Sequence, residues 1–203
     1  TAQNTAAVVC MNSGTVILAG GAFTTVYSGA ALAVGGGTMT LAPGAAAAPA
    51  DFLGMHKVVT VAPAVARIGD AVTGTGYLSI ADAIAAVQDG ETITVLQDID
   101  VSTSIELARD DIAGYTLDID GHTLKNSGDV HSIVRVGSTS TAAITITDSK
   151  GAAGERGEIL NRTDGSDGIS TGAGTVTLRD LTFTASNADA FSGRVVCSLV
   201  EAR

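Results

Sequence analysis

Ser13-Gly-Thr-Val-Ile-Leu-Ala-Gly-Gly-Ala-Phe-Thr24 aligns with Ala173-Gly-Thr-Val-Thr-Leu-Arg-Asp-Leu-Thr-Phe-Thr184, although 160 positions separate the two stretches. In the second stretch Thr alternates with Val and Leu, which is typical of a strand with one buried face, and the first stretch has Val16 and Leu18 at the matching positions. Gly36-Gly-Thr-Met-Thr-Leu41 repeats the first half, and Thr38 follows Thr15 by 23 positions. A period of this length predicts a solenoid, in which each repeat buries its apolar face against its neighbours.

Short alternating runs bounded by Gly, Asn, Asp or Ser also occur at 92–96, 115–119 and 143–147. We therefore predict an all-β chain that folds as a right-handed parallel β-helix. Inward Val, Ile and Leu side chains would stack from one turn of the solenoid to the next at ~4.8 Å, and Gly, Asn and Asp would form the corners.

One segment has helical spacing instead. Apolar residues recur between Leu78 and Val87, and Ser79 with Asp82 three positions later suits a helix start. Gly90 suits the left-handed conformation that ends many helices. We predict a short helix near residues 78–88 that caps one end of the solenoid and protects its unpaired strand edges.

Three segments carry a family resemblance: Ala66-Arg-Ile-Gly-Asp70, the helix and strand from Tyr77 to Asp98, and Leu117-Asp-Ile-Asp-Gly-His-Thr-Leu124. In this order they resemble the opening of pectate-lyase-like right-handed β-helix domains of bacterial cell-surface proteins. The resemblance implies an extracellular or cell-surface location and a structural or adhesive role, and it does not imply catalysis.

The order of the segments departs from that family. Residues 1–62 resemble late turns of the solenoid, residues 63–91 a linker and the cap helix, and residues 92–203 the β-helix body. Read from its end into its beginning, the chain gives an unbroken solenoid pattern, with 43 positions from Thr175 to Thr15. Residues 1–62 would therefore stack on the C-terminal end of their own chain or of a neighbouring copy. The residues expected at this junction are Val8, Val9, Cys10, Val195, Val196, Cys197 and Leu199.

Composition restricts the partners. The chain has 203 residues and a net charge of −10, which disfavours nucleic acid and anionic membrane surfaces. No Asp, Glu, Lys or Arg occurs in residues 1–50, but Gly, Thr, Ser and Pro interrupt every window long enough to span a membrane. Cys10 and Cys197 have no metal-binding or redox spacing, although a disulfide between them is possible.

One group of residues has the composition of a catalytic site. Asp118, Asp120, His122 and Lys125 lie together, with Asp110 and Asp111 just before them, and lyases of this fold use acidic Ca²⁺ ligands beside a basic residue. Because Asp120-Gly121 is a turn signal, we expect a structural corner instead. His56, His122 and His131 have no metal-ligand spacing. The acidic loop 148–158 with Asp164–Asp167 offers at most a weak Ca²⁺ site, and no other cofactor is expected.

Thr-x-Thr pairs recur at Thr92/Thr94, Thr145/Thr147 and Thr175/Thr177, as in proteins that bind ice through ladders of outward Thr. The intervals of 53 and 30 positions are unequal, so we expect the pairs to be ordinary β-branched strand residues that need not share a face.

These features together predict a non-enzymatic extracellular structural protein whose β-helix units join head to tail with copies of themselves into a filament or array. A surface adhesin or carbohydrate-binding module that binds glycans is the first alternative. A polysaccharide lyase is the second.

Overall fold

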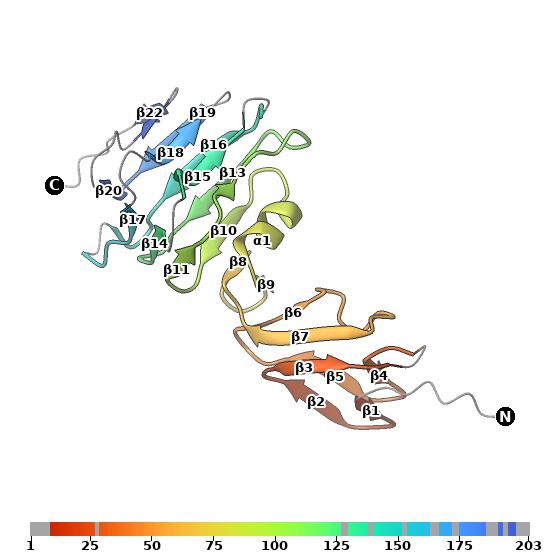
Figure 1. Cartoon of the computed structure of the whole chain (residues 1–203). Coiled ribbons are helices and arrows are strands. Elements are labelled where there is room, and N and C mark those ends of the chain that lie inside the picture. The colour runs from red at the N-terminus through yellow and green to blue at the C-terminus, as the bar shows by residue number, and fades with distance from the viewer. Residues whose placement is uncertain are drawn as a thin grey trace. The chain divides into compact units, whose positions relative to one another are not determined.

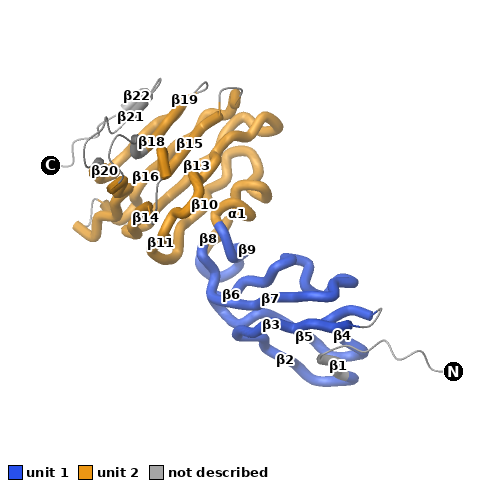
Figure 2. The backbone as a smooth tube through the Cα atoms, in the orientation of Figure 1, with its two compact units in different colours: residues 1–65, 71–79 blue, residues 66–70, 80–203 orange. Residues whose placement is uncertain are grey.

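Short strands dominate the computed structural model, which describes residues 9–26, 29–126, 130–137, 140–151, 154–162, 167–171, 175–185, 191–192 and 195–197. The expected all-β class is confirmed, and the expected helix is present as α1 (Ile80–Ala86). Figure 2 shows two compact units: unit 1 comprises residues 1–65 and 71–79, and unit 2 comprises residues 66–70 and 80–203.

Three parallel sheets build most of unit 2, and in each of them a strand pairs with the strand three places later in the chain (Figure 1). We call each group of three successive strands, one from each sheet, a layer. The first sheet contains β10 (Thr92–Val95), β13 (Gly114–Asp118), β16 (Ala143–Thr147), β19 (Thr175–Arg179) and β22 (Val195–Cys197). The second contains β11 (Ile99–Val101), β14 (Thr123–Asn126), β17 (Glu158–Asn161) and β20 (Thr182–Ala185). The third contains β12 (Ile105–Glu106), β15 (Ser132–Val136), β18 (Asp167–Thr171) and β21 (Phe191–Ser192).

Apolar residues at matching positions form the core of unit 2. In the first sheet, alternate residues are buried on every strand from β10 to β19, because successive side chains of a strand point to opposite faces. Direct register partners therefore continue one another through the layers. The buried partners are Ile93, Leu117, Ile146 and Leu178 in the first sheet and Leu124 and Ile159 in the second.

The start of unit 2 is closed by elements of a different kind. Strand β8 (Ala66–Ile68) pairs antiparallel with β10, and α1 packs against β8, β10 and β12. Ile80, Ala83 and Ile84 are the buried face of this helix. The expectation that Gly90 ends the helix is wrong: α1 ends at Ala86, and Gly90 adopts φ +76° in the turn before β10.

Unit 1 repeats the parallel pairing on a smaller scale. β1 (Val9–Met11) pairs with β4 (Leu32–Val34), and β2 (Thr15–Leu18) pairs with β5 (Thr38–Leu41). The second pair joins Thr15 to Thr38, so the repeat of 23 positions seen in the sequence is the register of the sheet.

Antiparallel pairing appears in unit 1 where the sequence pattern predicted only parallel pairing. β7 (Val58–Pro63) lies between β3 (Gly21–Thr24) and β6 (Ala45–Ala48) and pairs antiparallel with both, and β9 (Thr75–Tyr77) packs beside β6. The core of this unit contains Leu18, Ala31, Leu32, Met39, Ala47, Val59 and Val61. Among the described residues of the whole chain, no helix has the length and apolar character needed to cross a membrane.

Candidate functional site

The acidic residues that the sequence singled out lie at a corner of unit 2. Asp118 ends β13, and its Oδ1 accepts hydrogen bonds from the backbone N–H groups of Asp120 (2.9 Å) and Ser149 (2.9 Å). Asp120 has φ 45° and Gly121 φ 81°, which confirms the turn predicted from Asp-Gly. Asp118 is thus an acceptor for the turn and for the next layer.

Asp148 occupies the same corner one layer further on, and this residue is 1% exposed. Its Oδ1 accepts from the N–H groups of Gly121 (2.8 Å) and Lys150 (3.1 Å), and its Oδ2 accepts from the N–H of Gly157 (2.6 Å). A buried carboxylate is costly unless it is hydrogen-bonded, and three backbone donors meet that need here. The arrangement leaves Asp148 as a structural group rather than a free acid or base.

Side chains that accept a backbone N–H from the following layer recur throughout unit 2, and we call them interlayer acceptors. Asp89 accepts from Gly114, Asp98 from Thr123 and Glu106 from Gly137, at 2.9, 2.9 and 2.8 Å. Asp118 with Ser149 and Asn126 with Arg162 follow the same rule. The sequence separations vary from 25 to 36 residues because the loops differ in length, so no fixed spacing could have shown these pairs in advance.

The remaining members of the predicted acidic cluster have separate partners. Lys125 Nζ lies 3.4 Å from Asp100, and His122 Nδ1 lies 3.5 Å from Asp98, both on the second sheet or beside it. Lys150 Nζ lies 3.6 Å from Asp120. Asp111 pairs with Arg109, and Asp110 is exposed. The charged residues that are neighbours in the sequence between 110 and 125 therefore do not form one site, and most of them belong to separate ion pairs.

Among the described residues, no three His, Cys, Asp or Glu side chains come together in a group that could hold a metal ion. Asp148 of the acidic loop already accepts three N–H groups, and Asp164 lies outside the described residues. His56 lies 2.9 Å from Asp51, and His131 is exposed.

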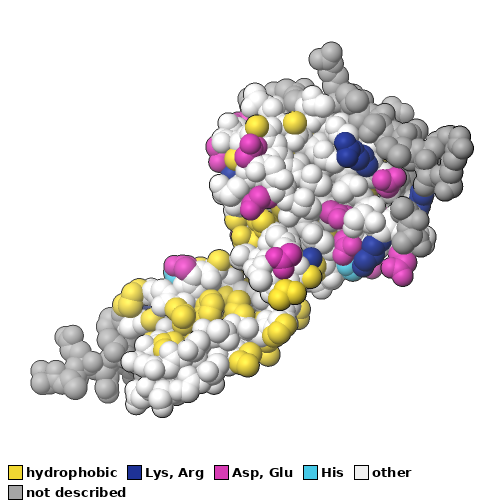
Figure 3. All heavy atoms as spheres, turned by 180° about the vertical axis from the view of Figure 1, so that it is seen from behind, with side chains coloured by type: hydrophobic (Ala, Val, Ile, Leu, Met, Phe, Trp, Pro, Cys, Tyr) yellow, Lys and Arg dark blue, Asp and Glu magenta, His cyan; other side chains and the backbone are white. Residues whose placement is uncertain are grey.

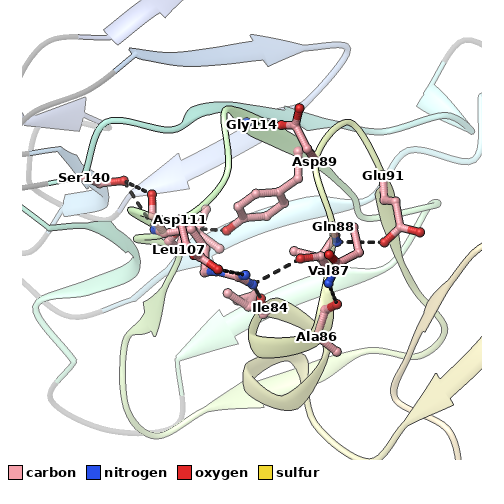
Figure 4. A network of polar contacts seen from close by, with 12 residues as sticks. Ile84, Ala86, Val87, Gln88, Asp89, Glu91, Leu107, Asp111, Gly114 and Ser140 are labelled. Carbon is pink, nitrogen blue, oxygen red and sulfur yellow. Dashed lines mark hydrogen bonds and ion pairs between the residues drawn. The ribbon is translucent and has the colours of Figure 1, made fainter.

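Arg109 is the centre of a polar network that the sequence did not reveal, and Figure 4 shows its partners Ile84, Val87 and Asp111. Its Nη1 donates to the carbonyl oxygens of Ile84 and Val87 at the C-terminal end of α1, the latter at 3.2 Å. Its Nε and Nη2 each donate to Asp111 at 2.7 Å. The guanidinium therefore satisfies carbonyl groups that a helix end leaves without partners.

Asp111 and Tyr115, which lie in or beside this network, have shifted pKa values. The hydrogen bonds from Arg109 lower the pKa of Asp111, which is exposed. Burial raises the pKa of Tyr115, whose hydroxyl donates to the carbonyl of Leu107 at 2.7 Å. Together these contacts connect α1 to the segment between β12 and β13.

Several Thr residues share a face, although their unequal spacing in the sequence did not require it. Thr92, Thr116, Thr145 and Thr177 are successive register partners on β10, β13, β16 and β19. The unequal intervals come from loops of different length, so sequence spacing does not report the face. The adjacent positions hold Asp118 and Arg179 as well as Thr94 and Thr147, which interrupts a uniform Thr surface.

The predicted junction residues are described in part. Val8 and Leu199 lie outside the described residues, and of Val9, Cys10, Val195, Val196 and Cys197 only the backbone is described, in β1 and β22. The pairing of Cys10 with Cys197 stays a prediction. At the ends of the parallel sheets, β22 pairs only with β19 and β2 only with β5 among the described strands.

Comparison with known proteins gives no relative: no family model matches the chain, and neither a curated protein nor a solved structure matches it.

Proposed function

We propose that the chain is a non-enzymatic extracellular structural protein, built as a right-handed parallel β-helix, whose units join head to tail. The pairing of each strand with the one three places later, in three parallel sheets, supports the β-helix. Connections between parallel strands of one sheet are almost always right-handed, which supports the hand.

The observation that carries the head-to-tail proposal is the difference between the two ends of unit 2. At its start, β8 runs antiparallel along β10 and α1 covers the first layer. At its other end, β22 pairs with β19 and with no other described strand. An exposed strand edge is a template for pairing with another chain, and proteins usually cover or charge such edges. If further copies add only at the β22 end of unit 2, all units of the resulting assembly point in the same direction.

The composition of unit 1 supports its role as the segment that covers that end. Its first 50 residues have no charged side chain, and interface centres are depleted in charge. All large hydrophobic side chains that are exposed in the described residues belong to unit 1, with Ile17 63%, Met55 77% and Val26 85% exposed. On the face drawn in Figure 3, hydrophobic side chains gather on unit 1, whereas charged side chains are spread over unit 2.

Other observations support the extracellular location and the non-enzymatic role that we propose. The resemblance to bacterial surface domains supports an extracellular location. The carboxylates at the corner of unit 2 bind backbone N–H groups, which supports a structural role for the acidic residues. A glycan-binding surface module is the alternative, and the outward polar residues of the first sheet would be its binding face.

Sedimentation velocity of the full chain over a hundredfold range of concentration, with electron microscopy of the same samples, tests the proposal. We expect species that grow with concentration and unbranched filaments one chain wide. A monomer at all concentrations, with residues 1–62 protected from protease, would show that unit 1 folds back on its own chain. Binding to a glycan array by such a monomer would favour the adhesin, and an unsaturated product released from acidic glycans would favour the lyase.

A further inference from the structure

We infer that β2 of one copy pairs in parallel with β22 of a second copy, with Val16 opposite Val195, Ile17 opposite Val196 and Leu18 opposite Cys197. This inference rests on the proposed head-to-tail assembly and specifies its register. The partner is a second copy of this chain, and the contact would continue the first sheet of unit 2 into the parallel pair β2–β5 of unit 1.

In unit 2, whether a residue of a strand is buried or outward determines which neighbouring strand its backbone N–H and C=O groups face. The N–H of Ala143 donates to the carbonyl of Ala113 (2.8 Å), and the carbonyl of Thr147 accepts from the N–H of Ile119 (2.9 Å). These residues of β16 alternate with the buried Ile144 and Ile146 and direct their backbone groups to the preceding strand. Because successive residues of a strand direct these groups to opposite sides, the buried residues direct theirs to the following strand.

Strand β2 obeys the same rule. The N–H of Thr38 donates to the carbonyl of Gly14, and the N–H of Ala42 to the carbonyl of Leu18, both at 2.8 Å. The buried Leu18 thus directs its carbonyl to the following strand, β5, as Ile144 and Ile146 do toward β19. By alternation, Thr15 and Ile17 direct their N–H and C=O groups to the edge away from β5. That edge is the side on which a preceding strand would lie.

Strand β22 presents the complementary edge. The carbonyl of Arg179 accepts from the N–H of Asp148 at 3.3 Å, so Arg179 and Thr177 direct their backbone groups to β16, and Val176 directs its groups to β22. Since Val176 is opposite Val195, the backbone groups of Val196 point back to β19. Those of Val195 and Cys197 point to the other edge of β22, which no described strand pairs with.

These directions select the register. With Val195 opposite Val16, the N–H of Ile17 would donate to Val195, and the N–H groups of Val195 and Cys197 would donate to Thr15 and Ile17. A shift by one residue would turn these donors and acceptors away from each other and would also exchange the buried and exposed faces.

Among the registers with the right parity, the sequence repeat selects one, and the burial pattern agrees with it. Val176 and Leu178 are buried on β19, and on β2 Val16 is half-buried and Leu18 is buried. Thr15-Val-Ile-Leu18 also aligns with Thr175-Val-Thr-Leu178 in the sequence repeat. Val195 and Cys197, the partners of Val176 and Leu178, would therefore lie between apolar residues on both sides.

Disulfide trapping tests this register. In a chain that carries Cys10→Ser and Cys197→Ser, Ile17→Cys is introduced into one batch and Val196→Cys into another, and the batches are mixed and oxidised. Paired strands place opposite Cα atoms ~4.8 Å apart, within disulfide range, whereas Thr177 lies one strand further, at ~9.6 Å. We expect at least tenfold more disulfide-linked dimer from the Ile17→Cys and Val196→Cys mixture than from the matched Ile17→Cys and Thr177→Cys mixture.

A second pair of variants checks the backbone contact. Ile17→Pro removes the N–H that would donate to Val195 while leaving the bonds between β2 and β5, and we expect loss of assembly. Ile17→Thr copies the residue at the equivalent position, Thr177, and should assemble like the parent chain.

The outcomes separate this inference from the proposed function. Filaments without the expected cross-link, or filaments formed by Ile17→Pro, would overturn the register and leave the head-to-tail proposal standing. In a further variant that carries both Ile17→Cys and Val196→Cys, a cross-link that forms only within single chains would show fold-back and overturn both. A monomer without any cross-link would also overturn both.

Discussion

Replacement of Asp148 by Ala tests the view that the acidic corner is structural. The substitution removes the acceptor of three backbone N–H groups, those of Gly121, Lys150 and Gly157. Gly157 is buried, so its N–H would have no water in place of the carboxylate, whereas Gly121 and Lys150 are only partly buried. A buried donor without a partner costs ~1–3 kcal/mol, with partly exposed donors at the low end. We therefore expect the free energy of unfolding of unit 2 to fall by about 3–5 kcal/mol.

Urea unfolding followed by far-UV circular dichroism measures this loss, and hydrogen exchange of residues 118–161 locates it. Total stabilities of domains are ~5–15 kcal/mol, so the variant would lose a large share. Asp148→Asn keeps one acceptor oxygen and should lose less than Asp148→Ala. Asp110→Ala is the matched control, because it removes the same charge from an exposed side chain and should stay within ~0.5 kcal/mol of the parent. A loss below ~1 kcal/mol for Asp148→Ala, or an equal loss for Asp110→Ala, would refute the reasoning.

Three further predictions concern unit 2. Arg109→Met keeps an apolar stem but removes the donors to Ile84 and Val87, so we expect a loss of ~1–3 kcal/mol in urea unfolding and faster hydrogen exchange in α1, whereas Asp111→Asn should leave α1 exchange unchanged. Burial raises the pKa of Tyr115 in the folded state, so the hydroxyl of the unfolded chain loses its proton first as the pH rises. The free energy of unfolding should therefore fall above a pH of about 10, by up to ~1.4 kcal/mol per pH unit. Tyr115→Phe should lack this part of the pH dependence, and identical slopes for the variant and the parent chain would contradict the prediction. Gly157→Ala would make its new Cβ clash with the carbonyl oxygen of His122, so the melting temperature of this variant should drop by several degrees. Gly20→Ala, whose Cβ meets nothing within 3.5 Å, should melt like the parent chain.

The local elements followed from local patterns. Alternation of Thr with Val, Ile or Leu indicated the strands at 92–96, 115–119 and 143–147, and the helical spacing after Leu78 indicated α1. The 23-residue repeat became the register of β2 on β5 because a parallel sheet stacks equivalent positions directly. These features depend on neighbouring residues or on one exact repeat, and both can be read in a sequence.

The antiparallel strand β7 and the end of α1 were not foreseen. β7 has the same alternation as a parallel strand, and alternation does not report strand direction. Gly90 looked like a helix end by its residue type, but Arg109 satisfies the carbonyls of α1 from 22 to 25 positions away. A contact over that distance leaves no local pattern.

The tertiary structure alone also determined which side chains contact one another. Asp118, Asp120, His122 and Lys125 are neighbours in the sequence, and the fold assigns them to separate contacts because each layer stacks on another whose loops have their own length. The same variable loops hid the column from Thr92 to Thr177, whose members are direct partners at unequal intervals. Side-chain alternation and repeat length are local properties of the chain and appear in its sequence. Which residues of one layer lie opposite which residues of the next depends on the length and path of every loop between them. Only the folded chain specifies those paths.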